Sequence, residues 1–176
     1  MGLLSPLRWK AAAALFGRYV SAKDNVLDIG CGNGWILRQV ARRGTGVDKN
    51  GKTLPKDTDA FKFVCGDATS RLPLPAAHFD VCIMSQIIEH LTEPEKALTE
   101  CRRLLRPGGR ILITTPKPWA DPVLSVLAGL HVFGKFYHVV YYTPHGLADM
   151  VKRAGFKSVE IHSYNLGLDT LLVARR

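Results

Sequence analysis

The chain has 176 residues, of which 47% are hydrophobic and 22% are charged, and this composition excludes a disordered or low-complexity protein. A chain of this length buries roughly 70% of the surface that its extended form exposes, so one compact domain is expected over residues 1–176. Lysine and arginine number 24 against 15 acidic residues, which gives a net charge of +9. This excess favours anionic partners such as phosphate, nucleic acid or lipid head groups, or serves solubility alone.

Membrane-spanning, secreted and metal-binding classes are not indicated by the sequence. The longest apolar stretch, residues 122–142, is broken by glycine, histidine and lysine, so it is too short for a spanning helix. Residues 1–22 contain basic residues and lack a signal-peptide cleavage site, which favours an amphipathic helix over a targeting sequence. The four cysteines form no C-x-x-C pair, so no metal site is predicted and a cytoplasmic protein is expected, with a peripheral position at an anionic membrane left open.

Apolar runs and turn residues alternate along the chain in the order expected of a βαβ protein. The predicted strands, in chain order, cover residues 25–29, 45–48, 61–65, 79–84, 110–115, 157–163 and 170–174. The predicted helices cover residues 1–22, 35–43, 94–105 and 144–154. Gly51 and Pro55 fall where a helix would join the second and third strands, so this crossover is expected to be truncated. Residues 116–143 interrupt the alternation with many aromatic side chains, and we expect them to form an insertion over the sheet.

The sequence DIGCGNG, residues 28–34, lies directly between the first strand and the following helix. Glycines at alternate positions let the backbone turn sharply and approach a ligand, and the helix that follows presents backbone amides to it. The dinucleotide fingerprint G-x-G-x-x-G/A is not met, because Trp35 or Leu37 stands where its last small residue would be. Asp28 precedes the glycines, where a carboxylate can meet an ammonium group. The loop therefore favours an amino-acid-bearing cofactor over a dinucleotide.

Two further acids end the second and third predicted strands. Asp48 follows Gly30 at close to the spacing of about 20 residues at which a carboxylate reaches ribose hydroxyls. Asp67 could accept a hydrogen bond from an adenine amino group while the backbone of Ala68 contacts the ring edge. A lone aspartate in such a place is also typical of a turn, and its position at the end of a third consecutive strand favours the binding role.

The motifs VLDIGCGNG, GVD, GDA, LPLPAAHFDVCIMSQIIEHL and LLRPGGRILITTP together resemble the class I S-adenosylmethionine-dependent methyltransferases. The similarity is close to the type 11 group, which includes ubiquinone and menaquinone methyltransferases, and runs from about Val26 to Pro116. It implies an α/β fold with a doubly wound, Rossmann-like, mostly parallel sheet of seven strands whose last strand is antiparallel. It also implies that the aromatic segment 116–143 is a substrate lid, which we expect over the carboxyl ends of the fourth and fifth strands.

The resemblance further implies S-adenosyl-L-methionine as the cofactor. The glycine loop would hold the methionine part, Asp48 the ribose, and Asp67 with Ala68 the adenine. The residues assigned to the cofactor are Asp28, Gly30, Cys31, Gly32, Gly34, Asp48, Lys49, Asp67, Ala68, Ser85 and Gln86. Ser85 and Gln86 would lie near the sulfonium. Lys49 departs from the family pattern, which has an apolar residue there to stack on adenine, and the lysine stem could only partly substitute.

Candidate bases follow the fourth predicted strand. Methyl transfer from a sulfonium needs mainly alignment, and a base is required only if the acceptor loses a proton. Glu89 and His90 stand beside the expected methyl position, although His90 could equally serve to hold the loop by hydrogen bonding. His138 and Tyr142, in the lid segment, could replace His90 as base or simply pack as half-buried aromatics.

The preferred function is methyl transfer to an oxygen, nitrogen or carbon atom of a small-molecule or lipid-like acceptor. An RNA or DNA methyltransferase is the first alternative, motivated by the charge. It is disfavoured because SQIIEHL, which ends the fourth strand, lacks the Asn/Asp-Pro-Pro-Tyr/Phe motif of nucleobase amino-methyltransferases. A cofactor-binding protein without catalysis is the second alternative, and Lys49 is the residue that suggests it.

Overall fold

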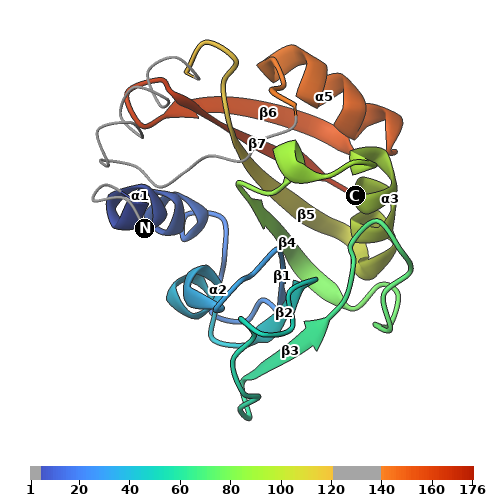
Figure 1. Cartoon of the computed structure of the whole chain (residues 1–176). Coiled ribbons are helices and arrows are strands. Elements are labelled where there is room, and N and C mark those ends of the chain that lie inside the picture. Colours follow the sequence, from blue (N-terminus) through green and yellow to red (C-terminus); the bar gives the residue numbers. More distant parts are fainter. Residues whose placement is uncertain (1–4, 121–139) are drawn as a thin grey trace.

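The computed structural model describes residues 5–120 and 140–176, and seven strands of this part form one sheet (Figure 1). The strands are β1 (Val26–Ile29), β2 (Gly44–Asp48), β3 (Phe61–Cys65), β4 (Phe79–Ser85), β5 (Leu105–Pro116), β6 (Lys157–Tyr164) and β7 (Asp169–Arg175). Their order in the sheet is β3-β2-β1-β4-β5-β7-β6. β7 runs antiparallel to both of its neighbours, β5 and β6, and the other four pairings are parallel. The doubly wound, mostly parallel sheet is thereby confirmed.

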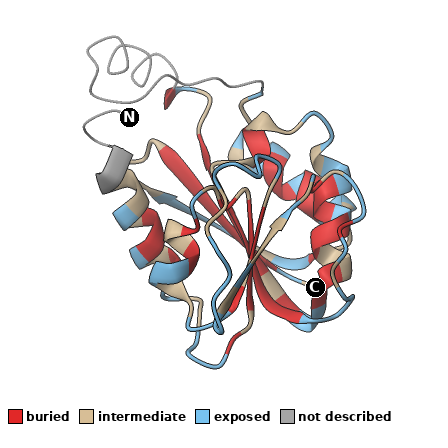
Figure 2. Ribbon diagram, turned by 60° about the horizontal axis from the view of Figure 1, so that its bottom comes forward, coloured by how far each residue is buried: buried red, intermediate tan, exposed pale blue. Residues whose placement is uncertain are grey.

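Helices cover both faces of the sheet (Figure 1). The four described α-helices are α1 (Ser5–Phe16), α2 (Trp35–Val40), α3 (Pro94–Leu104) and α5 (Pro144–Arg153). α1 and α2 pack on one face with Phe16 and Leu37, while α3 and α5 pack on the other with Leu98 and Val151. Figure 2 shows the buried residues concentrated in the strands and on the inward sides of the helices.

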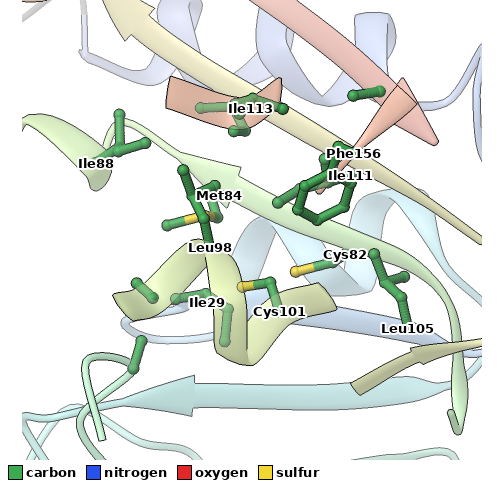
Figure 3. Packing of buried hydrophobic residues seen from close by; sticks show 14 of the residues in the cluster. Ile29, Cys82, Met84, Ile88, Leu98, Cys101, Leu105, Ile111, Ile113 and Phe156 are labelled. Atoms are coloured by element: carbon green, nitrogen blue, oxygen red, sulfur yellow. The ribbon is translucent and has the colours of Figure 1, made fainter. Parts of the chain in front are cut away.

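Alternation along the strands divides the core into two clusters. In β4, Val81 and Ile83 face the cluster beneath α1 and α2, whereas Cys82 and Met84 face the cluster beneath α3 and α5. Figure 3 shows this second cluster, in which Cys101 of α3 packs with residues of β4 and β5. Successive side chains of a strand point to opposite faces, so a strand covered on both faces is apolar throughout, as β4 is.

Several element boundaries differ from those predicted. The helix expected over residues 1–22 is α1, which ends at Phe16, and two tight turns follow in which Arg18 and Tyr19 donate to Leu15 and Phe16. The helix expected over residues 35–43 is α2, which ends at Val40 because the next residue is extended. β5 begins at Leu105, before the expected residue 110, because Leu105 already pairs with β4.

The predicted truncated crossover is confirmed, since no helix lies between β2 and β3. Residues 121–139, the greater part of the predicted lid, lie outside the described residues. The chain runs outward from β1 to β2 and β3 and then crosses to β4, so the direction of winding reverses between β1 and β4. Ligands of open α/β sheets bind at the carboxyl ends of the strands at such a reversal.

Candidate functional site

Two adjoining cavities lie at the carboxyl ends of β1, β2 and β4, and Gly30 lines both of them. The larger has a volume of about 440 Å³, within the range of small-molecule sites, and the smaller about 120 Å³. Six predicted cofactor residues line the larger cavity: Asp28, Gly30, Cys31, Gly32, Ser85 and Gln86. Five predicted site residues line the smaller one besides Gly30: Asp48, Lys49, Asp67, Ala68 and His90. The structure thus brings together most residues that the sequence had suggested.

Three predicted site residues line neither cavity. Gly34 is at the start of α2. Glu89 is buried, and Tyr142 packs against the core near it. His138 lies outside the described residues.

The glycine loop owes its shape to positive backbone angles. Gly30 has φ 72°, and a Cβ atom there would lie 2.7 Å from Cγ1 of Ile87, a contact that no side chain tolerates. Gly32 has φ 52°, and no atom lies within 4 Å of the place where its Cβ would be. The loop is therefore packed closely against Ile87, just after β4, at Gly30 and is open at Gly32, where a ligand can approach the backbone.

Asp28 is the most unusual carboxylate of the site. Its side chain is 2% exposed, it lines the larger cavity, and its Oδ2 has no hydrogen-bond partner in the structure. Burial, and then the nearby charge of Asp48, raise the pKa of Asp28 to about 8. A buried carboxylate oxygen without a partner is costly, and a ligand ammonium group would supply a balancing charge and the hydrogen bond that Oδ2 lacks.

Asp48 and Asp67 occupy the rim of the smaller cavity in different ways. Asp48 accepts hydrogen bonds from the backbone N–H groups of Gly32, at 2.9 Å, and Asn50, at 2.8 Å. Asp67 is exposed and accepts from the backbone and hydroxyl of Thr69, and the backbone bond is the main cause of its lowered pKa. A carboxylate has about four acceptor positions, so both residues keep capacity for a ligand.

Glu89 and His90 face different surroundings although they are neighbours in the short 3₁₀ turn η1 (Ile88–His90). His90 lines the smaller cavity beside the predicted adenine residues. The Oε2 atom of Glu89 accepts a hydrogen bond from the hydroxyl of Thr115 at 3.0 Å. Burial raises the pKa of Glu89 to about 7, and it also raises the pKa of Tyr142, to which the charge of Glu89 adds. The two candidate bases therefore belong to different parts of the site.

Two tryptophans of the larger cavity were missed in the sequence. Trp9 of α1 and Trp35 of α2 line this cavity, with their ring centroids 6.2 Å apart. Trp35 directly follows the glycine loop, a position that could have marked it as a ligand neighbour. Trp9 lies far upstream, and nothing in the local sequence connects it to this loop.

Other features of the described residues complete the description of the site. No helix within residues 5–120 and 140–176 is long and apolar enough to cross a membrane. The same residues contain no group of three His, Cys, Asp or Glu side chains arranged to hold a metal ion. The larger cavity has the buried carboxyl group of Asp28 in its wall, and the smaller one has the carboxylates of Asp48 and Asp67, so both offer acceptors to a polar ligand.

Comparison with known proteins agrees with this geometry. A family model described as a methyltransferase domain matches residues 27–113. The ubiquinone biosynthesis O-methyltransferase of Cereibacter sphaeroides (strain ATCC 17029) is 30% identical over 173 residues, covering 84% of this chain and 68% of that protein. The protein of the same name from Dechloromonas aromatica is 29% identical over 182 residues, covering 85% of this chain and 75% of its own.

A solved structure extends the comparison to the fold. A Haloferax volcanii putative methyltransferase, in complex with the Trm112 methyltransferase activator, superimposes with a TM-score of 0.80 at 19% identity. The match covers 98% of this chain and 91% of that one. At this identity the likeness supports the fold alone.

Proposed function

Because the chain belongs to the class I S-adenosylmethionine-dependent methyltransferases, we propose that it transfers the methyl group of that cofactor to an oxygen atom of a small-molecule or lipid-like acceptor. The acceptor atom and class are suggested by the relatives named as ubiquinone biosynthesis O-methyltransferases. The buried carboxylate of Asp28, which lines the larger cavity and whose Oδ2 has no hydrogen-bond partner, is the observation that fits the cofactor best.

Each part of the cofactor has a candidate partner among the residues of the two cavities. Asp28 would receive the ammonium group, and the open backbone at Gly32 would lie against the methionine chain. Asp48 would accept from the ribose hydroxyls, while Asp67 and Ala68 would contact the adenine. His90 lines the same cavity, so we assign it to the donor side.

When bound, the cofactor supplies a methyl group already activated on a positive sulfur, and S-adenosylhomocysteine is the product. The contribution of the protein is then to align the acceptor oxygen with the methyl carbon and to remove a proton if the oxygen carries one. A hydroxyl acceptor keeps its electron pair for the new O–C bond while its proton passes to a carboxylate.

Glu89 is the carboxylate that we propose for this proton. It lies where both ends of the predicted lid segment come together: Thr115, just before the segment, donates to its side chain, and the N–H of Val140, near the end of the segment, donates to its carbonyl. We therefore propose that the acceptor binds near Glu89, between these two described ends of the segment. A pKa of about 7 suits a general base near neutral pH.

Transfer of labelled methyl from S-adenosylmethionine tests this function. Purified protein is incubated with labelled cofactor and a panel of phenols, amines and organic-solvent extracts, and with nuclease-treated and untreated nucleic acid. We expect label in O-methyl groups of organic-soluble products. Label confined to N-methyl products or to nuclease-sensitive material would contradict the proposal. The Gly30→Ala variant serves as the inactive control.

A further inference from the structure

Arg8 connects α1, the first described helix, to the site. It lies 161 positions before its ion-pair partner Asp169 in the sequence. The Nη2 atom of Arg8 donates to Oδ1 of Asp169 at 2.8 Å and to Oε1 of Gln86 at 3.0 Å. The side chain of Arg8 is 16% exposed and that of Asp169 is 1% exposed. The pair is therefore largely removed from water, and each partner needs the other to balance its charge.

Asp169 is the centre of this contact. It is the first residue of β7, and its other oxygen, Oδ2, accepts from Nδ2 of Asn165 at 2.6 Å. Its Oδ1 also accepts from Nε2 of Gln86 at 3.4 Å. One buried carboxylate thus holds three side chains that come from α1, from the end of β4 and from the turn between β6 and β7.

The amide of Gln86 is held at both ends as a result. Its Oε1 accepts from Arg8, and its Nε2 donates to Asp169 and to the hydroxyl of Tyr164, the latter at 3.4 Å. The backbone of Gln86 has φ 53°, an unfavourable angle for this residue type, and its N–H donates to the carbonyl of Thr114 at 2.9 Å. A side chain fixed this firmly at the wall of the larger cavity is suited to hold a ligand in one position.

The same ion pair sets the position of Trp9. Trp9 follows Arg8 in α1 and lines the larger cavity together with residues of the glycine loop. Because Arg8 holds its turn of the helix to β4 and β7, it also holds the indole ring of Trp9 at the cavity, beside Trp35.

We propose that Arg8 and Asp169 are positioning residues of the donor site: their ion pair fixes the amide of Gln86 and keeps Trp9 at the wall of the larger cavity. This inference rests on the proposed placing of the methionine part of the cofactor in that cavity. Arg8 acts on the ligand through Gln86 and Trp9, so its effect depends on these residues being present.

Binding of S-adenosylhomocysteine, measured by calorimetry, tests the proposal without any acceptor. Arg8→Gln should weaken binding about tenfold, the equivalent of one hydrogen bond, and Asp169→Asn should weaken it at least as much. Lys10→Gln, an exposed site on the same helix, is the matched control and should change affinity less than about twofold. If the Asp169→Asn variant does not fold, the affinity of the Arg8→Gln variant alone tests the proposal.

A double-mutant cycle separates positioning from general stabilisation. Gln86→Ala alone should weaken binding, and adding Arg8→Gln to it should weaken binding by less than Arg8→Gln does in the unchanged protein, because part of its effect passes through Gln86. Effects that simply multiply, or an Arg8→Gln variant that binds like Lys10→Gln, would overturn the proposal. If the cycle is non-additive but no oxygen acceptor is methylated, the positioning role stands and the proposed acceptor chemistry fails.

Discussion

Asp48 accepts a hydrogen bond from the backbone of Gly32, with Oδ2 2.9 Å from the nitrogen, so the acid that ends β2 also holds the glycine loop that follows β1. The same carboxylate lines the smaller cavity, where the ribose is proposed to bind. The loop and the ribose site therefore share one side chain, and changing it should disturb both cavities.

Asp48→Ala is expected to weaken binding of S-adenosylhomocysteine by more than the loss of ribose contacts alone. Hydrogen bonds to a charged acceptor are worth about 1.5–3 kcal/mol each, and the loop loses its anchor in addition. Asp67→Ala is the comparison, because Asp67 is exposed and bonds only within its own turn in the structure described. Calorimetry should give a clearly smaller loss for Asp67→Ala; equal losses would mean that the loop anchor contributes nothing.

Asp28→Asn should stabilise the free protein while weakening cofactor binding. With a pKa of about 8 in the folded state and 3.8 as the ordinary value, Asp28 holds its proton in the folded protein but loses it in the unfolded chain between these two pH values. The contribution of Asp28 to the free energy of unfolding is therefore complete below about pH 4 and is lost as the pH rises towards 8. The variant should melt several degrees higher at pH 8, since 1 kcal/mol corresponds to about 2–4 °C here. Thermal melts at pH 5 and pH 8 measure the difference.

Cofactor affinity should rise with pH through the same group. An ammonium ligand favours the charged form of Asp28, so binding of S-adenosylhomocysteine releases its proton at pH values below about 8. Affinity is expected to increase by up to about tenfold per unit between pH 6 and pH 8. This dependence of affinity on pH should disappear in the Asp28→Asn variant. A wild-type affinity that is flat over this range would place the ammonium group elsewhere.

Gly30→Ala is predicted to be far more damaging than Gly32→Ala. Both residues have positive φ, which costs an alanine of order 1 kcal/mol, but only at Gly30 would the new methyl group strike a neighbour, Ile87. Overpacking of this kind adds about 1–3 kcal/mol and pushes the loop away from Ile87. Denaturant unfolding measures the stability difference, and calorimetry measures the accompanying loss of cofactor binding. Equal destabilisation of the two variants would contradict the close packing at Gly30.

Glu89→Gln should impair catalysis, whereas His90→Gln should impair cofactor binding. If Glu89 takes the proton, kcat/KM rises with pH through an apparent pKa near 7 as the carboxyl group ionises. Glu89→Gln should lower the rate about 10²–10⁴-fold and abolish this rise of kcat/KM with pH. His90→Gln should keep the rise of kcat/KM with pH and should instead weaken the binding of S-adenosylhomocysteine. If the rise of kcat/KM with pH persists in Glu89→Gln and is lost in His90→Gln, then His90 and not Glu89 is the base.

The central strands and the acids at their ends were predictable because each is local in the sequence. Val81 to Met84 is a continuous apolar run, the pattern of a strand buried on both faces, and β4 is such a strand. Asp28, Asp48 and Asp67 stand directly at strand ends, and parallel strands bring their carboxyl ends to one edge of the sheet. The resemblance to a known family supplied the strand order.

Contacts between distant segments could not be predicted in the same way. Arg8 and Trp9 reach the larger cavity only because α1 packs across the sheet, and no local pattern specifies that packing. Glu89 and His90 were treated as one pair, because sequence does not show that a 3₁₀ turn directs neighbouring side chains to different surroundings. Helix ends were also misplaced, since the end of α2 depends on where β2 begins.

The place of β7 in the sheet has a consequence for folding during synthesis. β7 leaves the ribosome after the other six strands, yet it is inserted between β5 and β6, which are not paired with each other. Until it arrives, β5 presents an open apolar edge, the kind of edge that invites pairing with another chain. Asp169 arrives with β7, so the ion pair between Arg8 and Asp169 can form only at this last stage. Cofactor should accordingly accelerate or protect only the last stage of folding, once that strand is in place.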